Sequence, residues 1–246
     1  MNLFFHIQRY FVFIKRVLRK PEKALFFRKN VVVEMDNIGI DSLGIVAIIS
    51  IFMGGVVTIQ TAFNTDHPLL PIYAVGFATR QSIILEFSPT IISLILAGKV
   101  GSRIASEIGS MRVTEQIDAL EVMGVNPASF LVLPKIVAAL IIFPPLVIVS
   151  MFLGIWGGWL VSAFTDVLPL SHYMSGIMLE FSQYDITYAL IKTLVFAFLI
   201  TSISGYFGFY TKGGALDVGH SSTKAVVFSS IFIIFFNLIL TQILLV

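Results

Sequence analysis

Two ionisable residues lie inside long apolar runs, where a charge is hardest to accommodate. Glu86 interrupts the run 81–98, and Lys192 interrupts the run 186–210. A charged side chain at membrane depth costs on the order of 2.5–3.5 kcal/mol on insertion scales, so it should face protein or a water-filled cavity. We therefore predict that Glu86 lines a cavity, where it contacts a polar headgroup or takes part in gating. The alternative is a Glu near the outer end of its span that reaches water or pairs with Arg80.

The sequence carries no motif for covalent or metal-dependent catalysis. Cys is absent and the four His residues are scattered singly, so neither a thiol nucleophile nor a metal-ligand cluster is indicated. The stretch 93–100 resembles a phosphate-binding loop only loosely, because it lacks the first Gly and the final Ser or Thr. We expect no catalytic residues, no metal ligands and no cofactor bound by this chain, and no nucleic-acid partner.

The composition indicates an integral membrane protein. Of the 246 residues, 57% are hydrophobic and 12% are charged, which is about half the charged fraction of a soluble domain. The mean hydropathy is +0.94. A soluble fold built from this chain would expose large apolar patches. Disorder is excluded by the abundance of apolar residues, among them 23 Phe.

Five apolar runs are long enough to cross a bilayer as helices, which takes about 20 residues each. Their expected bounds are 43–63, 81–107, 136–164, 186–210 and 225–246. The runs are too long and too uniformly apolar for barrel strands. The sequence therefore predicts an all-α integral membrane protein with five transmembrane helices, in which residues 1–246 form a single domain.

The distribution of Lys and Arg predicts the orientation, because cytoplasmic loops are enriched in these residues. With five spans, fourteen of the sixteen lie on one side: eight in the first 29 residues, four in 99–135 and two in 211–224. The other side holds one, Arg80, and Lys192 lies within a span. This asymmetry places the N-terminus in the cytoplasm and the C-terminus outside.

Residues 1–41 form a basic segment ahead of the first predicted span. Its bulky apolar residues recur at helical spacing, with Arg and Lys between them; they are Leu3, Ile7, Phe11, Ile14 and Leu18. This pattern is typical of an amphipathic helix lying in the cytoplasmic headgroup layer. It is not typical of a signal peptide, because the apolar stretch precedes the basic residues and no small-residue cleavage site follows. A topology anchor without activity is the simpler interpretation.

Small residues recur at every fourth position along the second span. They are Ser93, Ala97, Gly101, Ala105 and Gly109. Small side chains on one helical stripe let another backbone approach closely. We predict that this stripe packs against another helix, either within the chain or in a second copy.

The connection 99–135 contains a short amphipathic helix, predicted over Met111–Met123, which Gly124 and Pro127 should end. An apolar edge with a charged rim suits docking into a groove of a partner protein. The alternative, a helix lying passively on the bilayer, fits poorly with its excess of acidic residues, since the cytoplasmic leaflet is anionic. The residues assigned to the docking surface are Arg112, Glu115, Gln116, Ile117, Asp118, Leu120, Glu121, Met123 and Gly124.

These segments together resemble the MlaE/YrbE family, the permease subunits of ABC transporters that work with MCE proteins. The resemblance is densest over residues 80–160. It rests on the runs Glu86-Phe-Ser-Pro89, Ala97-Gly-Lys-Val-Gly101, Ser106-Glu107-Ile-Gly109, Met111 to Pro127, Leu133-Pro134 and Ile155-Trp-Gly-Gly158.

The resemblance implies a permease homodimer in the cell inner membrane, with the C-terminus in the periplasm. It further implies two ATPase subunits docked underneath, which bind the ATP, and an MCE-domain protein on the periplasmic side. The implied cargo is phospholipid, exchanged between the inner and outer membranes. The helix Met111–Met123 then resembles the coupling helix that receives motion from the ATPase.

Glu86 matches the cavity glutamate of the Arg-Glu-Leu-Gly-Pro motif of that family. This chain departs from the motif at Leu85, which replaces the Arg, and at Phe87 and Ser88. The charged pair that the Arg would make is therefore absent. Arg80 and Lys192 are the candidates to replace it.

Two other function classes compete with a lipid-transporting permease subunit. A stand-alone secondary transporter usually has inverted repeats and several intramembrane ionisable groups. A lipid-modifying membrane enzyme needs clustered His, Asp or Glu at one interface. The sequence fits both poorly. The discriminating observation is a co-purifying ATPase whose turnover needs this chain.

Overall fold

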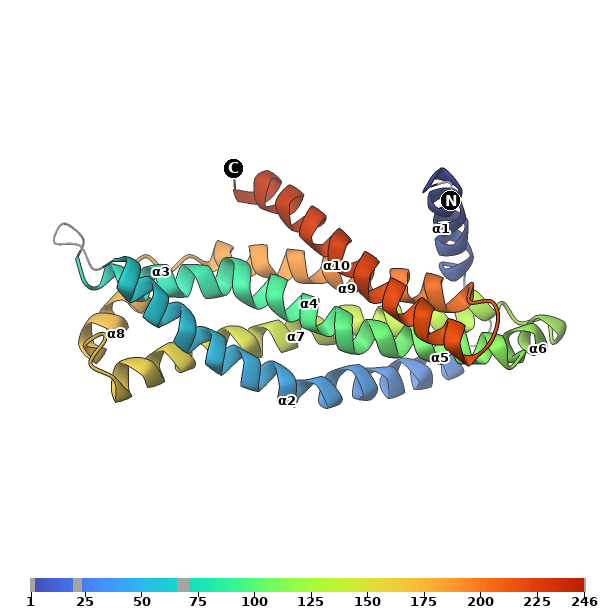
Figure 1. The fold of residues 1–246 in the computed structure, drawn as a ribbon, viewed down its shortest axis with the longest axis horizontal. Helices are drawn as coiled ribbons and strands as arrows, with labels where there is room; N and C mark the ends of the chain where they lie inside the picture. The colour runs from blue at the N-terminus through green and yellow to red at the C-terminus, as the bar shows by residue number, and fades with distance from the viewer. Residues whose placement is uncertain (1–2, 20–23, 66–70, 246) are drawn as a thin grey trace. The chain divides into compact units, whose positions relative to one another are not determined.

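The structure is a computed structural model that describes residues 3–19, 24–65 and 71–245 (Figure 1). It is 89% helical and has no strands in these ranges. The elements in chain order are α1 (Leu3–Val17), α2 (Ala24–Asn64), α3 (Ala74–Ser82), the π-helical segment η1 (Ile83–Ile91), α4 (Ile92–Leu96), the π-helical segment η2 (Ala97–Gly101), α5 (Ser102–Val113), α6 (Gln116–Val122), α7 (Pro127–Phe164), α8 (Leu170–Met178), α9 (Gln183–Phe209) and α10 (Ala215–Leu245).

Five helical stretches of the described chain are long and apolar enough to cross a membrane. They are Phe26–Asn64, Ala74–Val113, Pro127–Phe164, Gln183–Phe209 and Ala215–Leu245. Helices suit hydrocarbon because every backbone polar group in their interior is satisfied within the segment. The prediction of an all-α membrane protein with five spans is confirmed.

The first long helix begins much earlier than predicted. Helix α2 starts at Ala24, so residues 24–41 belong to the same continuous helix as the first predicted span. The helix can run on because its acidic residues have partners: Glu34 accepts a hydrogen bond from Lys135 at 2.5 Å, and Asp41 pairs with Arg103 at 2.8 Å. Residues 1–2 and 20–23 of the predicted segment, and residue 246 of the predicted last span, lie outside the described residues.

The other predicted spans also have different ends in the structure. Pro127 follows the short helix α6, as expected, and is also the first residue of α7, which begins nine residues before the predicted start of the third span. Pro is well suited to this position, because the amide hydrogen it lacks would have no helical partner there. Helix α10 begins at Ala215, ten residues before the predicted start of the last span.

The chain is organised in two compact units. Unit 1 comprises Met1–Asp41, Leu94–Phe143 and Val195–Ile239. Unit 2 comprises Ser42–Ser93, Pro144–Leu194 and Leu240–Val246. Each unit has its own buried residues and its own charged cluster.

In unit 2, glycines bring α2 and α7 into backbone contact. A Cβ atom added to Gly54 would overlap the carbonyl oxygen of Gly154, and one added to Gly157 would overlap that of Ile51. In a membrane, helices associate largely through such close packing, because lipid tails are as apolar as the side chains they would replace. These contacts therefore fix how α2 and α7 cross within the unit.

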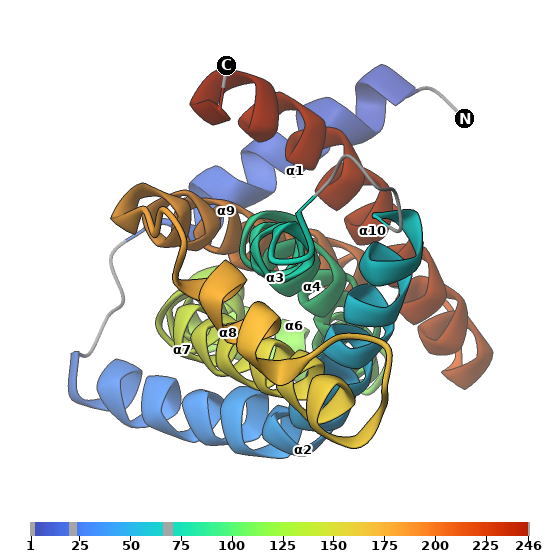
Figure 2. The same ribbon diagram turned by 90° about the vertical axis from the view of Figure 1, so that its left-hand side faces the viewer.

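Helices α3 and α8 lie side by side in unit 2 (Figure 2). Tyr173 of α8 is fully buried with Val75 and Leu168, and its hydroxyl donates a hydrogen bond to Ile155 O at 2.9 Å. Burial raises the pKa of Tyr173 to about 12, although a hydrogen bond with Thr58 acts in the opposite direction. The phenol is thus neutral at physiological pH and fastens α8 to α7.

In unit 1, the predicted stripe of small residues packs against α9 and the residues directly after it. A Cβ atom added to Gly101 would lie 2.9 Å from Ser204 Oγ, and one added to Gly109 would lie 3.1 Å from Thr211 Oγ1. Ala97 and Ala105 are fully buried, as is Ser93, the member of the stripe that belongs to unit 2. The chain thus uses this stripe for its own helix packing.

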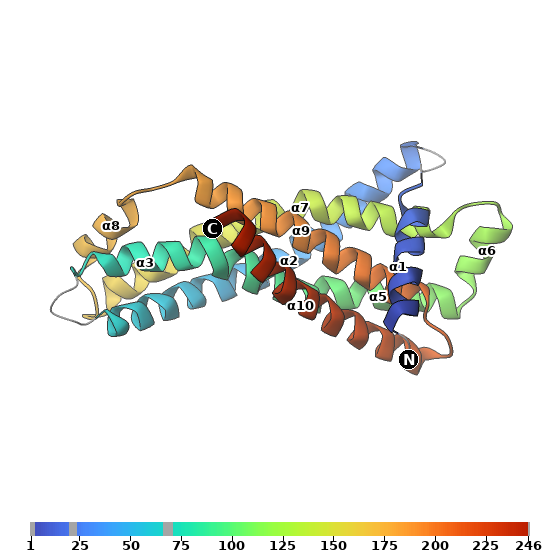
Figure 3. The same cartoon turned by 90° about the horizontal axis from the view of Figure 1, so that it is seen from above.

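The predicted amphipathic N-terminal helix is α1. Figure 3 shows it beside the C-terminal part of α9, and its Phe13 and Val17 are fully buried there. Ile7 and Phe11, which belong to the predicted apolar face, are exposed. The side chain of Leu3 lies outside the described part of the chain. Helix α1 therefore has one face on the protein and another face open.

The glycine contact between α2 and α7 predicts a position-specific effect of adding one methyl group. Gly54→Ala should lower the midpoint of thermal unfolding in detergent by roughly 2–10 °C, since overpacking typically costs about 1–3 kcal/mol. Gly44→Ala is the matched control, because Gly44 lies on the same helix with nothing within 4 Å of an added Cβ. It should leave the midpoint unchanged or raise it slightly. Equal effects of the two variants would contradict the close approach.

Candidate functional site

Glu86 lies in η1, a π-helical segment that also contains Pro89. Pro has no amide hydrogen, so the regular helical hydrogen-bond ladder cannot be completed at that position. Segments of π-helix are rare and occur frequently at functional sites. In unit 2, this segment brings Glu86 against Lys192 of α9.

Lys192 is the centre of a polar cluster in unit 2. Its Nζ donates hydrogen bonds to Glu86 Oε1 at 2.9 Å and to Tyr188 Oη at 2.8 Å. Thr241 Oγ1 and Leu85 O complete the surroundings at 3.2 Å and 3.3 Å. An ammonium group has three hydrogens to donate, and four acceptors surround this one. The cluster therefore satisfies a cation that has no access to water.

The two charges of the pair differ in exposure. The Lys192 side chain is fully buried, whereas 41% of the Glu86 side chain is exposed. Glu86 Oε2 lies 3.4 Å from the Thr90 hydroxyl. The carboxylate is thus hydrogen-bonded within the cluster and remains partly exposed. In this arrangement Glu86 can accept a hydrogen bond from a polar group of a ligand while Lys192 keeps its charge compensated.

Arg80, the other candidate counter-charge, is directed elsewhere. Its Nη1 donates to the carbonyl oxygens of Ile177 at 2.6 Å and Leu179 at 2.7 Å, and Nη2 donates to that of Glu180 at 3.3 Å. Arg80 therefore binds the end of α8 and the residues after it. Of the two candidate partners, the structure pairs Glu86 with Lys192 and not with Arg80.

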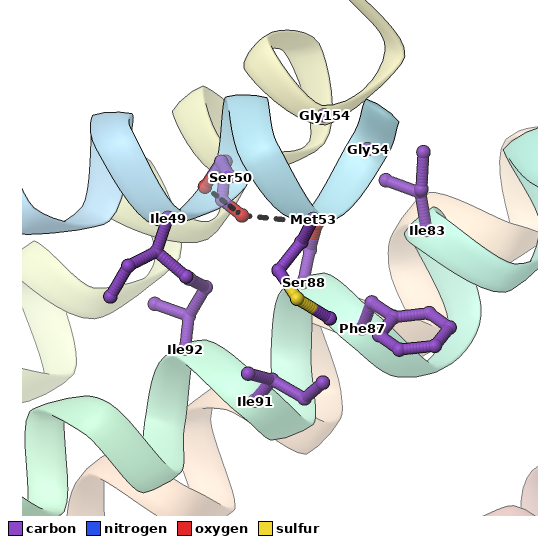
Figure 4. A pocket seen from close by; sticks show the side chains of 11 residues that line it. Ile49, Ser50, Met53, Gly54, Ile83, Phe87, Ser88, Ile91, Ile92 and Gly154 are labelled. Carbon is purple, nitrogen blue, oxygen red and sulfur yellow. Dashed lines mark hydrogen bonds between the residues drawn. The ribbon is translucent and has the colours of Figure 1, made fainter. Parts of the chain in front are cut away.

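The residues that follow Glu86 line a small, partly open pocket within unit 2 (Figure 4). Its walls are mostly apolar, with Phe87 among them. The polar exception is a chain of three hydroxyls, in which Ser150 Oγ lies 2.8 Å from Ser50 Oγ and 3.1 Å from Ser88 Oγ. Segment η1 thus contributes both the partly exposed Glu86 carboxylate and one wall of this pocket.

The predicted cytoplasmic helix Met111–Met123 is not one helix. Helix α5 continues to Val113, and Glu115 then adopts a left-handed conformation with φ of 61° before α6 begins at Gln116. A non-glycine residue with positive φ is uncommon. The turn at Glu115 redirects the chain, so α6 is a separate short helix.

Helix α6 is fastened to unit 1 by one buried side chain and one ion pair. Ile117 is fully buried, and Arg112 Nη1 donates to Asp118 Oδ1 at 2.6 Å across the turn. Gly124 follows the helix with φ of 78°, the left-handed conformation that commonly ends helices. Ile117 is therefore an anchor, and its predicted place on the docking edge is wrong.

The free surface of α6 combines acidic and apolar side chains. The exposed members of the predicted set are Glu115, Gln116, Asp118, Glu121, Met123 and Gly124, whereas Arg112 and Leu120 are half-buried. Val122, which the sequence analysis did not assign, is 88% exposed, and Met123 is 67% exposed. The apolar side chains of Val122 and Met123 thus face outward on a helix whose acidic side chains, Glu115, Asp118 and Glu121, are also exposed.

A second charged cluster, in unit 1, escaped the sequence analysis. Lys135 Nζ donates to Glu34 Oε1 at 2.5 Å and to the two carboxylate oxygens of Glu107 at 2.9 and 2.8 Å. Lys135 is only 3% exposed. The available signal was the position of Lys135 beside a long apolar run, which calls for a partner just as Glu86 does. Across the described residues, no group of three His, Asp or Glu is placed to hold a metal ion.

Comparison with known proteins decides the family. The profile of the Permease MlaE family matches residues 31–243, which include the Glu86–Lys192 cluster and α6. The chain belongs to the MlaE permease family.

Relatives of this MlaE permease carry names that agree with that family. A probable ABC transporter permease protein of Rickettsia prowazekii (strain Madrid E) is 33% identical over 237 residues, which cover 94% of this chain and 88% of the relative. A protein of the same description from Synechocystis sp. is 34% identical, covering 87% of this chain and 81% of the relative. The protein TRIGALACTOSYLDIACYLGLYCEROL 1, chloroplastic, of Arabidopsis thaliana is 32% identical, covering 92% of this chain and 65% of that protein. The chain is thus a multi-pass membrane permease subunit of the ABC transporter class.

The unequal exposure of the ion pair predicts unequal effects of removing its members from the MlaE permease. Glu86→Ala leaves a fully buried ammonium without its counter-charge, and breaking a buried pair in this way typically costs about 3–5 kcal/mol. Lys192→Met leaves a partly exposed carboxylate that keeps its hydrogen bonds with Tyr188 and Thr90, so it should lower the midpoint of thermal unfolding less. The double variant should recover part of the loss caused by Glu86→Ala. A larger loss for Lys192→Met than for Glu86→Ala would contradict the arrangement.

Proposed function

We propose that this MlaE permease is the membrane subunit of an ABC transporter that moves phospholipid between the inner and outer membranes, driven by a separate ATPase. The observation that carries the proposal is that α6, in the connection between two spans, is a short acidic helix with exposed apolar side chains. The ATPase binds the ATP, because this chain carries no nucleotide-binding motif.

Helix α6 is suited to receive motion from a partner. Val122 and Met123 offer apolar contact area beside Asp118 and Glu121, and interfaces commonly combine such an apolar centre with a polar rim. Ile117 and the Arg112–Asp118 ion pair fasten the helix to α5. A displacement of α6 is therefore passed to α5, which packs closely against α9, where a Cβ atom added to Gly208 would lie 2.8 Å from Ala105 O.

The lipid cargo is supported by the polar cluster and the pocket of unit 2. Glu86, whose side chain is 41% exposed, can contact a polar headgroup, and the apolar residues of the neighbouring helices, Phe87 among them, can contact acyl chains. The Arabidopsis relative carries the name of a lipid. In this scheme the chain breaks no covalent bond of the lipid. It supplies a polar contact for the headgroup and a separate apolar surface for the acyl chains.

The assembly that we propose contains two copies of this chain, two ATPase subunits and an MCE-domain protein on the periplasmic side. The distribution of Lys and Arg supports an inner-membrane orientation with a cytoplasmic N-terminus and a periplasmic C-terminus. Helix α10 supports a second copy, since only 11% of its most apolar window is buried. Much of its circumference is therefore available to lipid or to another helix.

Purification from the native membrane tests the proposal. The tagged chain should bring down an ATPase whose turnover depends on it, and Val122→Asp should reduce the recovered ATPase activity by about tenfold or more. The unfolding midpoint should not change, because the Val122 side chain is 88% exposed. Normal recovery and turnover with this variant would contradict docking at α6.

Two variants control for this experiment. Leu216→Asp introduces the same charge at a side chain that is 84% exposed but lies at the start of α10, so the ATPase should be retained. Ile117→Asp places a carboxylate at a fully buried position, so it should lower the unfolding midpoint as well. The contrast separates loss of docking from loss of folding.

A further inference from the structure

Helix α1 is built into unit 1 by contacts along one of its faces. The Phe13 ring packs against Tyr206 and Phe209 of α9, with ring centroids 5.8 and 5.3 Å apart. The Tyr10 hydroxyl lies 2.7 Å from Ser202 Oγ. A helix that served only as a membrane anchor would not need these specific side-chain contacts with α9. The position of α1 is therefore tied to that of α9 (Figure 3).

The C-terminal end of α1 is also bonded to the chain that leaves α6. Asn126 Nδ2 donates to Arg16 O at 2.9 Å, and Ser129 Oγ donates to Arg19 O at 2.8 Å. Arg16 lies in the last turn of α1 and Arg19 lies two residues after the helix, so the two hydrogen bonds hold both the end of α1 and the chain that leaves it. Asn126 follows α6 by four residues. The exit of α6 is thus fastened to α1.

A second face of α1 is open and apolar. Ile7, Phe11 and Leu18 are 44%, 68% and 59% exposed, and their spacing places them on one stripe of the helix. Lys15 is exposed beside this stripe, and Arg16 is exposed farther round the helix. Residues 1–19 contain four Lys or Arg and no Asp or Glu. An apolar stripe with a cationic flank matches a bilayer surface that carries anionic headgroups.

We propose that α1 binds anionic phospholipid in the adjacent leaflet, and that this binding orders the connection that follows α6. Anionic headgroups attract the cations of α1 and hold its apolar stripe in the membrane. The carbonyl groups of Arg16 and Arg19 then keep their hydrogen bonds from Asn126 and Ser129, and these bonds order the connection between α6 and α7. Where the ATPase docks on α6, the lipid charge sets how well ATP turnover is coupled; this last step rests on the proposed function.

Hydrogen exchange of the full-length chain alone tests the link without any ATPase. The chain is placed in nanodiscs of phosphatidylcholine with or without about 30% phosphatidylglycerol. Amide exchange over residues 116–130 should be about fivefold slower in the anionic discs, a typical size for coupling between two sites. High salt should shrink the difference, because it screens charges at the membrane surface. Equal exchange in the two lipids would overturn the proposal.

Variants show whether the signal passes through the two hydrogen bonds. Asn126→Asp with Ser129→Ala removes both donors with little change in size and should abolish the lipid difference. Ser222→Ala is the matched control: its hydroxyl donates to Ser102 O at 3.1 Å in the same unit without touching α1, so the difference should persist. A lipid difference that survives in the double variant would overturn the link.

A second variant and a second readout keep the test decisive. If the double variant is not recovered folded, Phe11→Asp on the open face should abolish the same lipid difference. In the complete complex, anionic lipid should raise ATP turnover, and the double variant should remove that increase. Slower exchange in anionic discs without any co-purifying ATPase would support the role of α1 and refute the proposed function.

Discussion

A charge enclosed among apolar helices has to be compensated by residues from other helices, and both units of this permease are arranged around that requirement. In unit 2, Lys192 takes its acceptors from η1, α9 and α10. In unit 1, Lys135 joins α7 to α2 and α5. An unpaired charge in such surroundings would be expensive. Each lysine therefore fixes the register of the helices that supply its partners.

Helix α6 differs from this pattern, and the difference indicates its use. The carboxylates of Glu115 and Glu121 are exposed, and so are the apolar side chains of Val122 and Met123. A helix that only linked two spans would need neither feature. The fold thus separates enclosed, compensated charges, which hold the spans together, from open charges that are available to a partner. A permease without nucleotide-binding residues of its own needs such a contact.

The sequence was sufficient for features that depend on composition and spacing. Five spans and the amphipathic α1 follow from apolar runs and periodicity. The start of α2 was not predicted because Glu34 and Asp41 interrupt the apolar pattern of the sequence. Only the structure shows that they form ion pairs with Lys135 and Arg103. The turn at Glu115 was missed because no glycine marks it. Ile117 and Val122 are both apolar, and only the three-dimensional structure shows which one is buried.

The measurement that tests the account most directly is the accessibility of α6 from each side of the membrane. The chain contains no Cys, so Gln116→Cys introduces a single thiol at an exposed position. A membrane-impermeant maleimide should leave this thiol unlabelled when added to spheroplasts and label it in inverted membrane vesicles. Loss of that labelling when the ATPase is bound would place the partner on α6. Labelling in intact spheroplasts would contradict a cytoplasmic ATPase contact at this helix.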